Sequence, residues 1–492
     1  MNSYILSIDA GTTGITVLIL NHQAKICGKY YSEFTQHYPQ PGWVEHDGEE
    51  IWRVTHQLVE SAFRDHNPRE CAGIGIANQR ETTLIWNRDI GQPIHNAIVW
   101  QCQRTQAICQ KLKDMGHETK FKQKTGLVIN SYFSGTKIKW LLDNCEGALK
   151  KAENGNLAFG TIDSWLLWKL TGGKVHATDY TNASRTLIFN IDNLCWDKEL
   201  LSILKIPSSL LPRVLPSSGD FGVTDPNLFG ESIPITGIAG DQQAALFGQG
   251  CYNTGESKCT YGTGCFLLTN TGTQRINSSA GLLTTIACDA DGKPAYSLEG
   301  SVFMGGAVIQ WLRDELQLLK HVADSEKMAQ SVQDNNGVVM VPAFTGLGAP
   351  YWDMEARGIL TGLTRGSNRN HIVRAALESI AYQVKDLLDA MFIDMDLDLA
   401  TLKVDGGAAA NNFLMQFQAD MIQQAIDRPM NIESTALGAG MLSGLSSGFW
   451  INTQELIAMR KTDRIFTPQM PAKYRFNLLQ SWKKAIEKTQ YK

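Results

Sequence analysis

The chain has 492 residues, more than one hydrophobic core usually serves, so two large domains are expected. Its composition, 43% hydrophobic and 19% charged with a net charge of −4, is that of a soluble enzyme and makes nucleic acid and anionic membranes poor partners. No apolar run has the length of a transmembrane helix, and the amino terminus lacks a signal-peptide pattern. We therefore expect a cytoplasmic protein without stable membrane insertion.

The ten cysteines indicate reduced thiols rather than a disulfide or metal framework. The sequence contains no Cys-x-x-Cys pair and no histidines spaced with cysteines for zinc. Reduced thiols are what a reducing compartment favours.

Residues 4–20 predict a tight hairpin rich in glycine and threonine. Tyr4–Ile8 and Ile15–Leu20 are typical of strands, and Asp9–Gly14 is too short and glycine-rich for a helix. Such a tip can aim backbone N–H groups and threonine hydroxyls at a small anion, and the carboxylate beside it can hold the magnesium that accompanies nucleotide phosphates. Taken alone, the pattern is more typical of a polar hairpin without a ligand.

After this hairpin, strands alternate with helices, which predicts an α/β protein. The expected strands are Cys71–Asn78, Asn96–Gln101 and Ile235–Gly240, and the expected helices are Ile138–Asp143, Asp163–Leu170, Val302–Leu319 and His371–Met391. A second hairpin is expected at Lys258–Asn270 and a third glycine turn at Leu402–Ala408. Two similar hairpins indicate a duplicated architecture with a cleft between the halves, divided in the turn-rich segment Gly248–Gly255.

Polar residues follow two of these strands, where α/β proteins commonly place catalytic groups. Arg80 and Glu81 suit a small polyol, but they reach one ligand together only if the strand has ended, and a solvated surface pair is equally consistent. Asp241 could accept a proton from an attacking hydroxyl or cap the following helix, and the local sequence favours the cap.

Other candidate residues are weaker when judged singly. Trp100, Tyr132 and Phe266 are more typical of core aromatics than of pocket walls. The turn at Gly406 and Gly407 allows a flat ring to approach the backbone, and Asn411 could bond an adenine edge, although an ordinary strand-to-helix turn also fits. Since the sequence lacks both the P-loop and the dinucleotide fingerprint, ATP would have to bind by another scheme.

Two long strings resemble the signatures of the FGGY carbohydrate kinases: YFSGTKIKWLLDN (Tyr132–Asn144) and GILTGLTRGSNRNHIVRAALE (Gly358–Glu378). Further strings resemble the branch of that family that phosphorylates glycerol: NQRETT, SYFSGTK, HATDYTNASRT, AGDQQAALFGQ, TYGTGCFLL and GLGAPYW. The matches run in order along the chain, so the chain is identified as a member of this family.

The resemblance implies an α/β fold of the duplicated actin-like (ribonuclease H-like) ATPase type, with domains 1–250 and 251–492 around a central cleft. It implies transfer of the γ-phosphoryl group of ATP to glycerol, giving sn-glycerol 3-phosphate, with Mg2+ as cofactor and a homo-oligomer (dimer or tetramer) as the assembly. Asp241 matches the general base and Asp9 the carboxylate near magnesium. The residues that match glycerol contacts are Arg80, Glu81, Trp100, Tyr132, Asp241, Gln242 and Phe266, and those that match the ATP site are Thr12, Thr13, Gly14, Thr263, Gly306, Gln310, Gly407 and Asn411.

Two departures from the family pattern leave alternatives open. Thr16 stands where members commonly have an arginine, which removes positive charge near the transferred phosphate and is expected to slow turnover or loosen product. Cys102 and Gln103 stand where an Asp-Arg pair is usual beside the substrate strand. The alternatives are a kinase of another small polyol or a triose, and an actin-like ATP-binding scaffold that has lost phosphoryl transfer.

Overall fold

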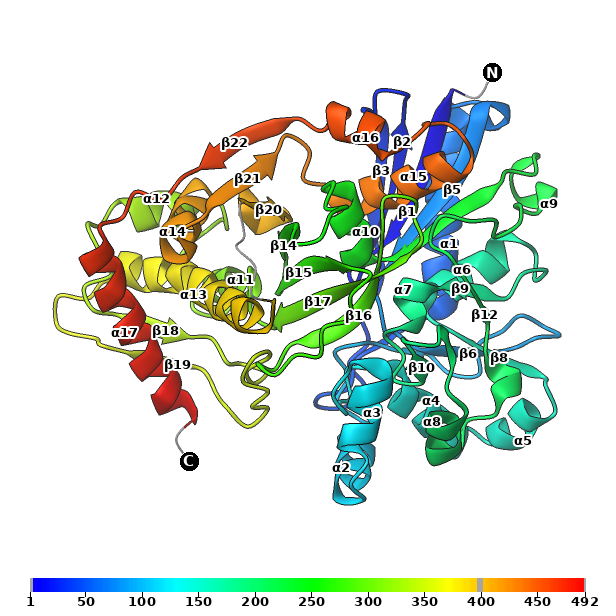
Figure 1. The fold of residues 1–492 in the computed structure, drawn as a ribbon, viewed down its shortest axis with the longest axis horizontal. Helices are drawn as coiled ribbons and strands as arrows, with labels where there is room; N and C mark the ends of the chain where they lie inside the picture. The colour runs from blue at the N-terminus through cyan, green and yellow to red at the C-terminus, as the bar shows by residue number, and fades with distance from the viewer. Residues whose placement is uncertain (1–2, 396–400, 491–492) are drawn as a thin grey trace.

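The computed structural model describes residues 3–395 and 401–490, which form two mixed β-sheets with helices around them (Figure 1). The first sheet has the order β13-β5-β1-β2-β3. Its strands are β1 (Tyr4–Ala10), β2 (Gly14–Leu20), β3 (Ile26–Glu33), β5 (Cys71–Asn78) and β13 (Ile235–Gly240). The strands β1, β2 and β3 form an antiparallel meander, and β5 and β13 extend the sheet in parallel from β1.

The second sheet repeats this pairing pattern. Its order is β16-β17-β15-β14-β20-β21-β22. Its strands are β14 (Ser257–Tyr261), β15 (Cys265–Gly272), β16 (Leu283–Cys288), β17 (Pro294–Val302), β20 (Thr401–Asp405), β21 (Ala425–Pro429) and β22 (Thr462–Phe466). Here β14, β15 and β17 form the meander, and β20 and β21 follow β14 in parallel, as β5 and β13 follow β1. The predicted duplicated α/β architecture is confirmed.

Shorter elements connect and cover the two sheets. The remaining strands are β4 (Glu45–His46), β6 (Leu84–Asn87), β7 (Ala97–Ile98), β8 (Leu157–Gly160), β9 (Ala177–Asp179), β10 (Phe189–Asn190), β11 (Cys195–Trp196), β12 (Arg213–Leu215), β18 (Val339–Val341) and β19 (Ile359–Thr361). The helices of the first half are α1 (Gly48–Asp65), α2 (Gln106–Asp114), α3 (Glu118–Thr125), α4 (Ser134–Asn144), α5 (Ala148–Glu153), α6 (Ile162–Leu170), α7 (Tyr180–Ala183), α8 (Lys198–Leu204), α9 (Pro226–Phe229) and α10 (Asp241–Gly248). Those of the second half are α11 (Ala307–Asp314), α12 (Asp324–Gln330), α13 (Arg369–Met395), α14 (Asn412–Ile422), α15 (Ser434–Ser446), α16 (Thr453–Met459) and α17 (Ala472–Gln490).

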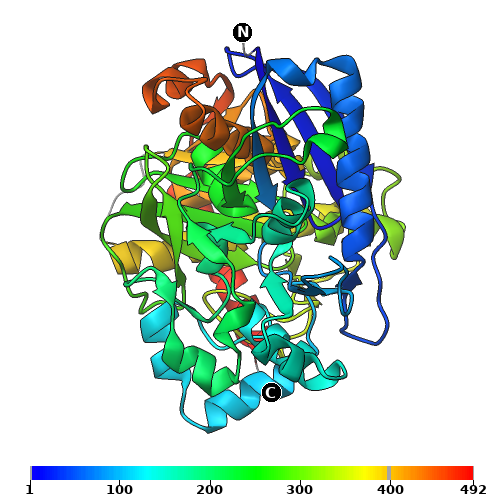
Figure 2. The same cartoon turned by 90° about the vertical axis from the view of Figure 1, so that its right-hand side faces the viewer.

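Helices cover both faces of the first sheet (Figures 1 and 2). On one face, α1 and α6 pack on the side chains of Leu6, Ile8 and Val17, which alternate with those facing the other way. On the opposite face lies α15, although it comes from the second half of the chain; Ile5 and Leu18 pack against it. The second half thus supplies part of the core of the first sheet.

The helix α15 approaches its neighbours closely because glycines lie at the contacts. A Cβ atom on Gly438 would lie 1.8 Å from the carbonyl oxygen of Ala244 in α10, and one on Gly75 in β5 would lie 2.1 Å from that of Ala439. Since α10 begins at Asp241, this packing fixes the helix that carries the predicted base.

Two of the predicted elements are wrong in extent. The expected strand Asn96–Gln101 is reduced to β7, which pairs with the two-residue strand β4 and, through Ile98, with the single residue Thr83. The helix expected over Val302–Leu319 is confined to α11, because β17 continues to Val302 and a glycine pair, Gly305 and Gly306, turns the chain before the helix. Beyond α11 the backbone turns at Gln317 with a φ of 52°.

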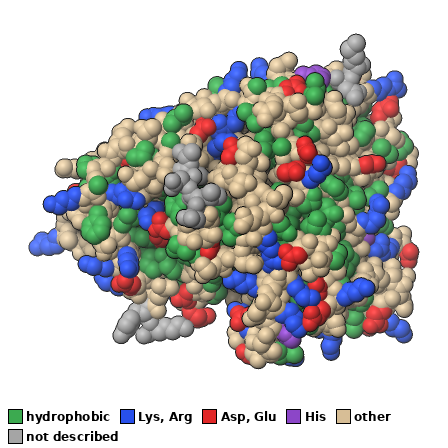
Figure 3. Space-filling model, in the orientation of Figure 1, with side chains coloured by type: hydrophobic (Ala, Val, Ile, Leu, Met, Phe, Trp, Pro, Cys, Tyr) green, Lys and Arg blue, Asp and Glu red, His purple; other side chains and the backbone are tan. Residues whose placement is uncertain are grey.

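The other elements agree with the pattern analysis. The predicted stripe of α13 is buried along its length, namely Val373, Ala376, Ile380, Val384, Leu387 and Met391. All ten cysteines are free thiols. Within residues 3–395 and 401–490, no helix is both long and apolar enough to cross a membrane. Acidic and basic side chains are intermingled over the face that Figure 3 shows.

Candidate active site

A cleft of about 430 Å3 lies where the two predicted hairpins meet. It is lined by Thr12, Thr13, Gln36, Tyr38, Arg80, Glu81, Trp100, Gln101, Tyr132, Asp241, Gln242, Thr260, Gly262, Thr263, Gly264, Phe266 and Gln310. All seven predicted polyol residues are in this set, together with Thr12, Thr13, Thr263 and Gln310 of the predicted ATP site. The fold therefore brings together residues from both halves of the sequence.

Arg80 and Glu81 reach the cleft because β5 has already ended, at Asn78. Glu81 adopts a φ of 60°, a left-handed backbone conformation that is energetically unfavourable for residues other than glycine. With this turn in the backbone, the side chains of Arg80 and Glu81 both line the cleft. The two side chains are only 2% and 1% exposed, so the interpretation as a solvated surface pair is wrong.

Asp241 is the first residue of α10, and Gly240 holds the N-cap position, so the interpretation of Asp241 as an N-cap is wrong. Its Oδ1 accepts a hydrogen bond from the backbone N–H of Gln242 at 2.7 Å and lies 3.2 Å from Nε of Arg80. Burial raises the pKa of Asp241, while Arg80 and Lys258 act to lower it. A carboxylate at the end of a strand, facing the cleft, can accept a proton from a bound hydroxyl.

Three aromatic rings form an apolar wall of the cleft. The ring centroid of Trp100 lies 5.6 Å from that of Tyr132 and 6.2 Å from that of Phe266, both in edge-to-face arrangements. The indole Nε1 of Trp100 donates to Oγ1 of Thr12 at 3.0 Å, which ties this wall to the first hairpin.

Side-chain amides hold the first hairpin from behind. Gln36 donates to the carbonyl oxygen of Thr12 at 3.0 Å, and Gln79 donates to that of Gly11 at 3.1 Å. His46 lies between the two amides, with Nε2 2.7 Å from Oε1 of Gln36 and Nδ1 3.3 Å from Nε2 of Gln79. This pattern requires a neutral ring, protonated on Nε2, and burial lowers the pKa of His46 to about 3.

This network predicts acid sensitivity. The pKa of His46 in the folded state, about 3, lies below its ordinary value of 6.5, so on acidification the unfolded chain binds the proton first. The contribution of His46 to stability is complete above its ordinary pKa and is lost as the pH falls from there toward the folded value. We expect the change from pH 7 to pH 5 to lower the free energy of unfolding by about 2 kcal/mol through this residue.

Urea unfolding at the two pH values measures this effect. His46→Gln keeps a polar side chain but cannot titrate, so its free energy of unfolding should fall by that much less between pH 7 and pH 5. Equal pH dependence in parent and variant would contradict the assignment.

The second hairpin is closed by its own glycines. The backbone N–H of Gly262 donates to the carbonyl oxygen of Gly264 at 2.9 Å, and the carbonyl oxygen of Gly262 accepts the backbone N–H of Gly306 at 2.8 Å. Gly306 is the N-cap of α11, and a Cβ atom on it would lie 3.6 Å from Cβ of Ala408, in the turn after β20. The hairpin, the start of α11 and the third glycine turn are therefore neighbours.

Not every predicted ATP residue lines the cleft. Gly14, Gly306, Gly407 and Asn411 are outside its lining. Gly407 lies open, with no atom within 4 Å of an added Cβ. Asn411 is the N-cap of α14, where its Oδ1 accepts the N–H of Leu414 at 2.9 Å and its Nδ2 donates to Oγ of Ser325 at 3.3 Å, so both ends of the amide already have a protein partner.

Asp9 lies at the end of β1 and has the chemistry of a cation ligand. Its buried Oδ1 has no hydrogen-bond partner. Burial, together with the charges of Asp241 and Glu433, raises the pKa of Asp9 to about 8, so a nearby cation would be needed to keep it ionised at lower pH. Across the part of the chain that the structure describes, no cluster of three or more metal-binding side chains occurs, so a metal here would take other ligands from phosphate and water.

Thr16 lies across from Asp9 in the first hairpin. No cationic side chain stands at this position, as the sequence indicated. In the other departure Cys102 is buried, at 1% exposed, and Nε of Arg104 donates to its Sγ at 3.1 Å, whereas Gln103 is half-buried. Arg104 keeps a carboxylate partner, because its Nη2 lies 2.7 Å from Oε1 of Glu45.

Sequence reasoning missed three buried charged residues beside the cleft, Arg185, Lys258 and Glu299. Lys258 donates from Nζ to Oε1 of Gln242 at 2.5 Å and to Oγ1 of Thr260 at 2.8 Å, which orients the amide of Gln242. For Lys258 and Glu299 the available signal was a single charged residue within a strand-like string, KCTY and YSLEGSVF, whereas Arg185 lies outside any strand and gave no such signal.

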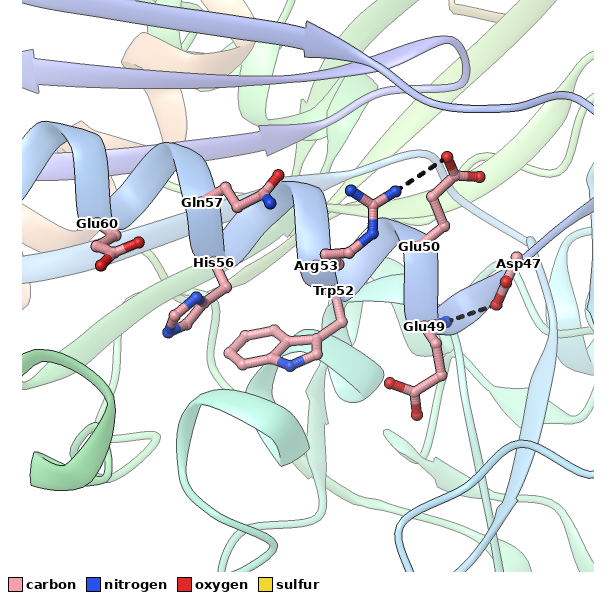
Figure 4. Close-up of a pocket in the computed structure, with 8 residues that line it drawn as sticks. All are labelled: Asp47, Glu49, Glu50, Trp52, Arg53, His56, Gln57 and Glu60. Carbon is pink, nitrogen blue, oxygen red and sulfur yellow. Dashed lines mark hydrogen bonds and ion pairs between the residues drawn. The ribbon is translucent and has the colours of Figure 1, made fainter.

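A larger hollow, of about 790 Å3, lies along the outer face of α1 (Figure 4). Its lining includes the carboxylates of Asp47, Glu49, Glu50 and Glu60, against the single guanidinium of Arg53, which pairs with Glu50 at 3.3 Å. This excess of negative charge would repel a nucleotide. The cleft between the hairpins is the better candidate for phosphate chemistry.

Comparisons with known proteins identify the family of the chain. Residues 4–248 match the N-terminal domain, and residues 257–447 the C-terminal domain, of the FGGY family of carbohydrate kinases. The chain is 59% identical over 486 residues to a glycerol kinase of Carboxydothermus hydrogenoformans (98% of this chain, 97% of the relative) and 58% identical to one of Halothermothrix orenii, with the same coverage. The crystal structure of Plasmodium falciparum glycerol kinase with ADP superposes with a TM-score of 0.92 at 36% identity, covering 100% of this chain and 99% of that one. The chain belongs to the FGGY family of carbohydrate kinases.

Proposed function

We propose that this protein transfers the γ-phosphoryl group of ATP to a terminal hydroxyl of glycerol, forming sn-glycerol 3-phosphate and ADP. The observation that carries the proposal is the convergence of Asp241, Arg80 and Glu81 in one cleft with two glycine-threonine hairpins. The relatives named glycerol kinase, which match over nearly the whole chain, support the choice of glycerol.

The polar groups of the cleft complement a small triol. Arg80 and Gln242 donate to substrate hydroxyls, Glu81 accepts from one, and Trp100 and Phe266 cover the carbon edge. Such a pocket discriminates against ligands that leave its buried polar groups without partners. Asp241 accepts the proton of the attacking hydroxyl as its oxygen bonds to phosphorus, and ADP leaves with the electron pair of the broken P–O bond.

The two hairpins hold the phosphates. Thr12, Thr13 and Thr263 present hydroxyls and backbone N–H groups from opposite sides, which positions the transferred group and stabilises its charge. Asp9, with its unpartnered Oδ1, would hold Mg2+ here. When bound, the ion supplies positive charge to the phosphate oxygens.

A second candidate is a kinase of a longer polyol or a triose. A cavity of about 140 Å3 adjoins the cleft and shares Trp100, Gln101, Tyr132 and Thr263 with it. Gln103, at a position where the chain departs from its family, lines this cavity. Room beside the substrate wall favours a polyol with additional carbon atoms, whereas a triose has the same three carbons as glycerol and gains nothing from it.

ADP release coupled to a chromogenic reaction, with ATP, Mg2+ and a panel of polyols, tests both candidates. We expect kcat/KM to be highest for glycerol. Higher values for erythritol or dihydroxyacetone would favour the second candidate, and the absence of turnover on every polyol would favour a scaffold.

We also propose that the two kinase domains meet at residues 250 and 251, within the segment 249–256 that neither family model covers. A homo-oligomer, dimer or tetramer, and a cytoplasmic location stay predictions. Sedimentation velocity measures the first of these.

A further inference from the structure

We propose that Glu299 and Arg185, neither of which lines the cleft, are positioning residues that hold Arg80 and Glu81 in their polyol-binding orientation. This inference rests on the proposed function, because it assigns a purpose to the network behind the same pocket. It makes substrate recognition depend on a residue of the second sheet, in β17, which runs between the two halves of the molecule (Figure 1).

The guanidinium of Arg80 is held by both oxygens of Glu299. Nη1 of Arg80 lies 2.5 Å from Oε2 of Glu299, and Nη2 lies 3.0 Å from Oε1. Such a bidentate pair fixes the plane as well as the position of a guanidinium. With both terminal nitrogens engaged, Nε of Arg80 faces Asp241 at 3.2 Å.

Arg185 extends this pair to Glu81. Its Nη2 lies 3.0 Å from Oε1 of Glu299, and its Nε lies 2.6 Å from Oε1 of Glu81. Both ion-pair contacts of Glu81, with Arg185 and with Nε of Arg80 at 3.9 Å, use Oε1, so Oε2 is the oxygen available to a ligand. The charges therefore alternate in a chain that runs from Arg80 through Glu299 and Arg185 to Glu81.

The network is buried, which makes its geometry energetically demanding. The side chains of Arg185 and Glu299 are fully buried, and those of Arg80 and Glu81 are at most 2% exposed. Burial alone would raise the pKa of Glu299, but Arg185 and Arg80 lower it to about 2, so it is anionic throughout the neutral range. A buried charge without a partner is strongly destabilising, so a side chain that loses its partner is expected to move towards another charge of opposite sign.

For Arg80 the nearest other carboxylate is that of Asp241, at 3.2 Å from Nε, and Nη1 of Arg80 also donates to the neutral Oε1 of Gln243 at 3.2 Å. If Glu299 were neutral, the guanidinium would be drawn towards Asp241 and Glu81, its remaining carboxylate neighbours. Arg80 would then leave the orientation that serves the substrate, and Asp241 would be a poorer base because its anion is more strongly paired. We expect polyol binding to suffer most, kcat less and ATP binding least. Glu299 pairs with Leu268 in a strand of the second hairpin, but its side chain and that of Arg185 lie outside the cleft lining, in contact with Arg80 and Glu81.

A purely structural role is the alternative, and the chain offers a matched control. Arg374 and Glu378 in α13 form another buried pair, at 2.8 Å, with Glu378 2% exposed and also accepting from Asn335. Glu378→Gln removes the same charge from the same kind of partner, away from the cleft. It is expected to lower the melting temperature without changing the affinity for polyol.

The experiment compares Glu299→Gln with Glu378→Gln in the full-length enzyme. Calorimetric titration gives Kd for glycerol and for ATP, and steady-state assays give KM and kcat. We expect Glu299→Gln to weaken glycerol binding by about tenfold or more, with ATP affinity changed less than about twofold. An unchanged glycerol Kd, or equal losses for glycerol and ATP, would overturn the proposal.

Two milder variants keep the test decisive if Glu299→Gln does not fold. Glu299→Asp keeps the charge but shortens the reach, and Arg185→Lys keeps the charge but loses the fork that joins Glu299 to Glu81. Each should raise KM for glycerol by more than it lowers kcat, and Glu378→Asp should do neither. Variants that fold like the parent and bind glycerol equally well would refute the positioning role.

The outcome is separable from that of the proposed function. Turnover of glycerol by the parent enzyme decides the proposed function. If the parent prefers another polyol in the panel, the same variants are measured on that ligand by calorimetry, which requires no turnover, and the selective loss of polyol affinity is still expected.

Discussion

Asp241→Asn is expected to lower kcat for glycerol phosphorylation by about 10²- to 10⁴-fold, the range that loss of a general base produces. Asparagine has the same shape and can still accept the N–H of Gln242 through Oδ1, a bond that Asp241 makes at 2.7 Å. It cannot accept the proton of the attacking hydroxyl. Coupled measurement of ADP release, with ATP affinity measured separately by equilibrium binding, checks the prediction.

ATP affinity should stay within about threefold of the parent value, because the hairpins and not the base hold most of the phosphate contacts. Asp386→Asn is the control: this half-buried acid of α13 accepts hydrogen bonds from Tyr351 and Trp482, outside the cleft, so its loss should affect stability and leave kcat unchanged. Turnover of Asp241→Asn near the parent rate would exclude the residue as the base.

Much of the cleft was predictable because its signals are local. Glycine and threonine between two apolar runs encode a hairpin over a few residues, and both hairpins formed where expected. A polar residue after a buried strand is equally readable, which is how Arg80 and Asp241 were found. The local sequence did not decide the roles of these two residues. The burial of Arg80 excludes a solvated surface pair, and the N-cap position of Gly240 excludes Asp241 as the cap.

The network behind the pocket was not predictable in the same way. Glu299 and Arg80 are separated by 219 residues in the sequence, and nothing local to either one indicates the other. A charged residue in an apolar strand is compatible with an exposed face, a snorkelling side chain or a buried pair, and only the sheet order selects among these. The helix predicted from Val302 was wrong for a different reason. The prediction followed the helical spacing of the apolar residues and disregarded Gly305 and Gly306, which lie between the end of β17 and the start of α11.

The helices α15 and α10 pack with close backbone contact at Gly438, beneath the active site. Gly438 lies inside α15, where alanine would favour the helix by about 1 kcal/mol on propensity alone. Its Cβ atom, however, would lie 1.8 Å from the carbonyl oxygen of Ala244, so α15 and α10 would have to separate. Overpacking of this kind outweighs propensity, and we expect Gly438→Ala to lower the free energy of unfolding by about 2–4 kcal/mol.

The sign of the change in the free energy of unfolding decides between helix propensity, which would stabilise Gly438→Ala, and overpacking, which would destabilise it. Urea unfolding of Gly438→Ala measures it against Gly366→Ala, an exposed loop glycine whose nearest neighbours to an added Cβ lie at 3.6 and 3.7 Å, where the change should be within about 0.5 kcal/mol. A stabilised Gly438→Ala would show that the two helices part easily. Since α10 begins at Asp241, a displaced helix also moves the base away from the substrate, so we expect the folded fraction of Gly438→Ala to have a lower kcat than the parent, whereas Gly366→Ala should not differ from it.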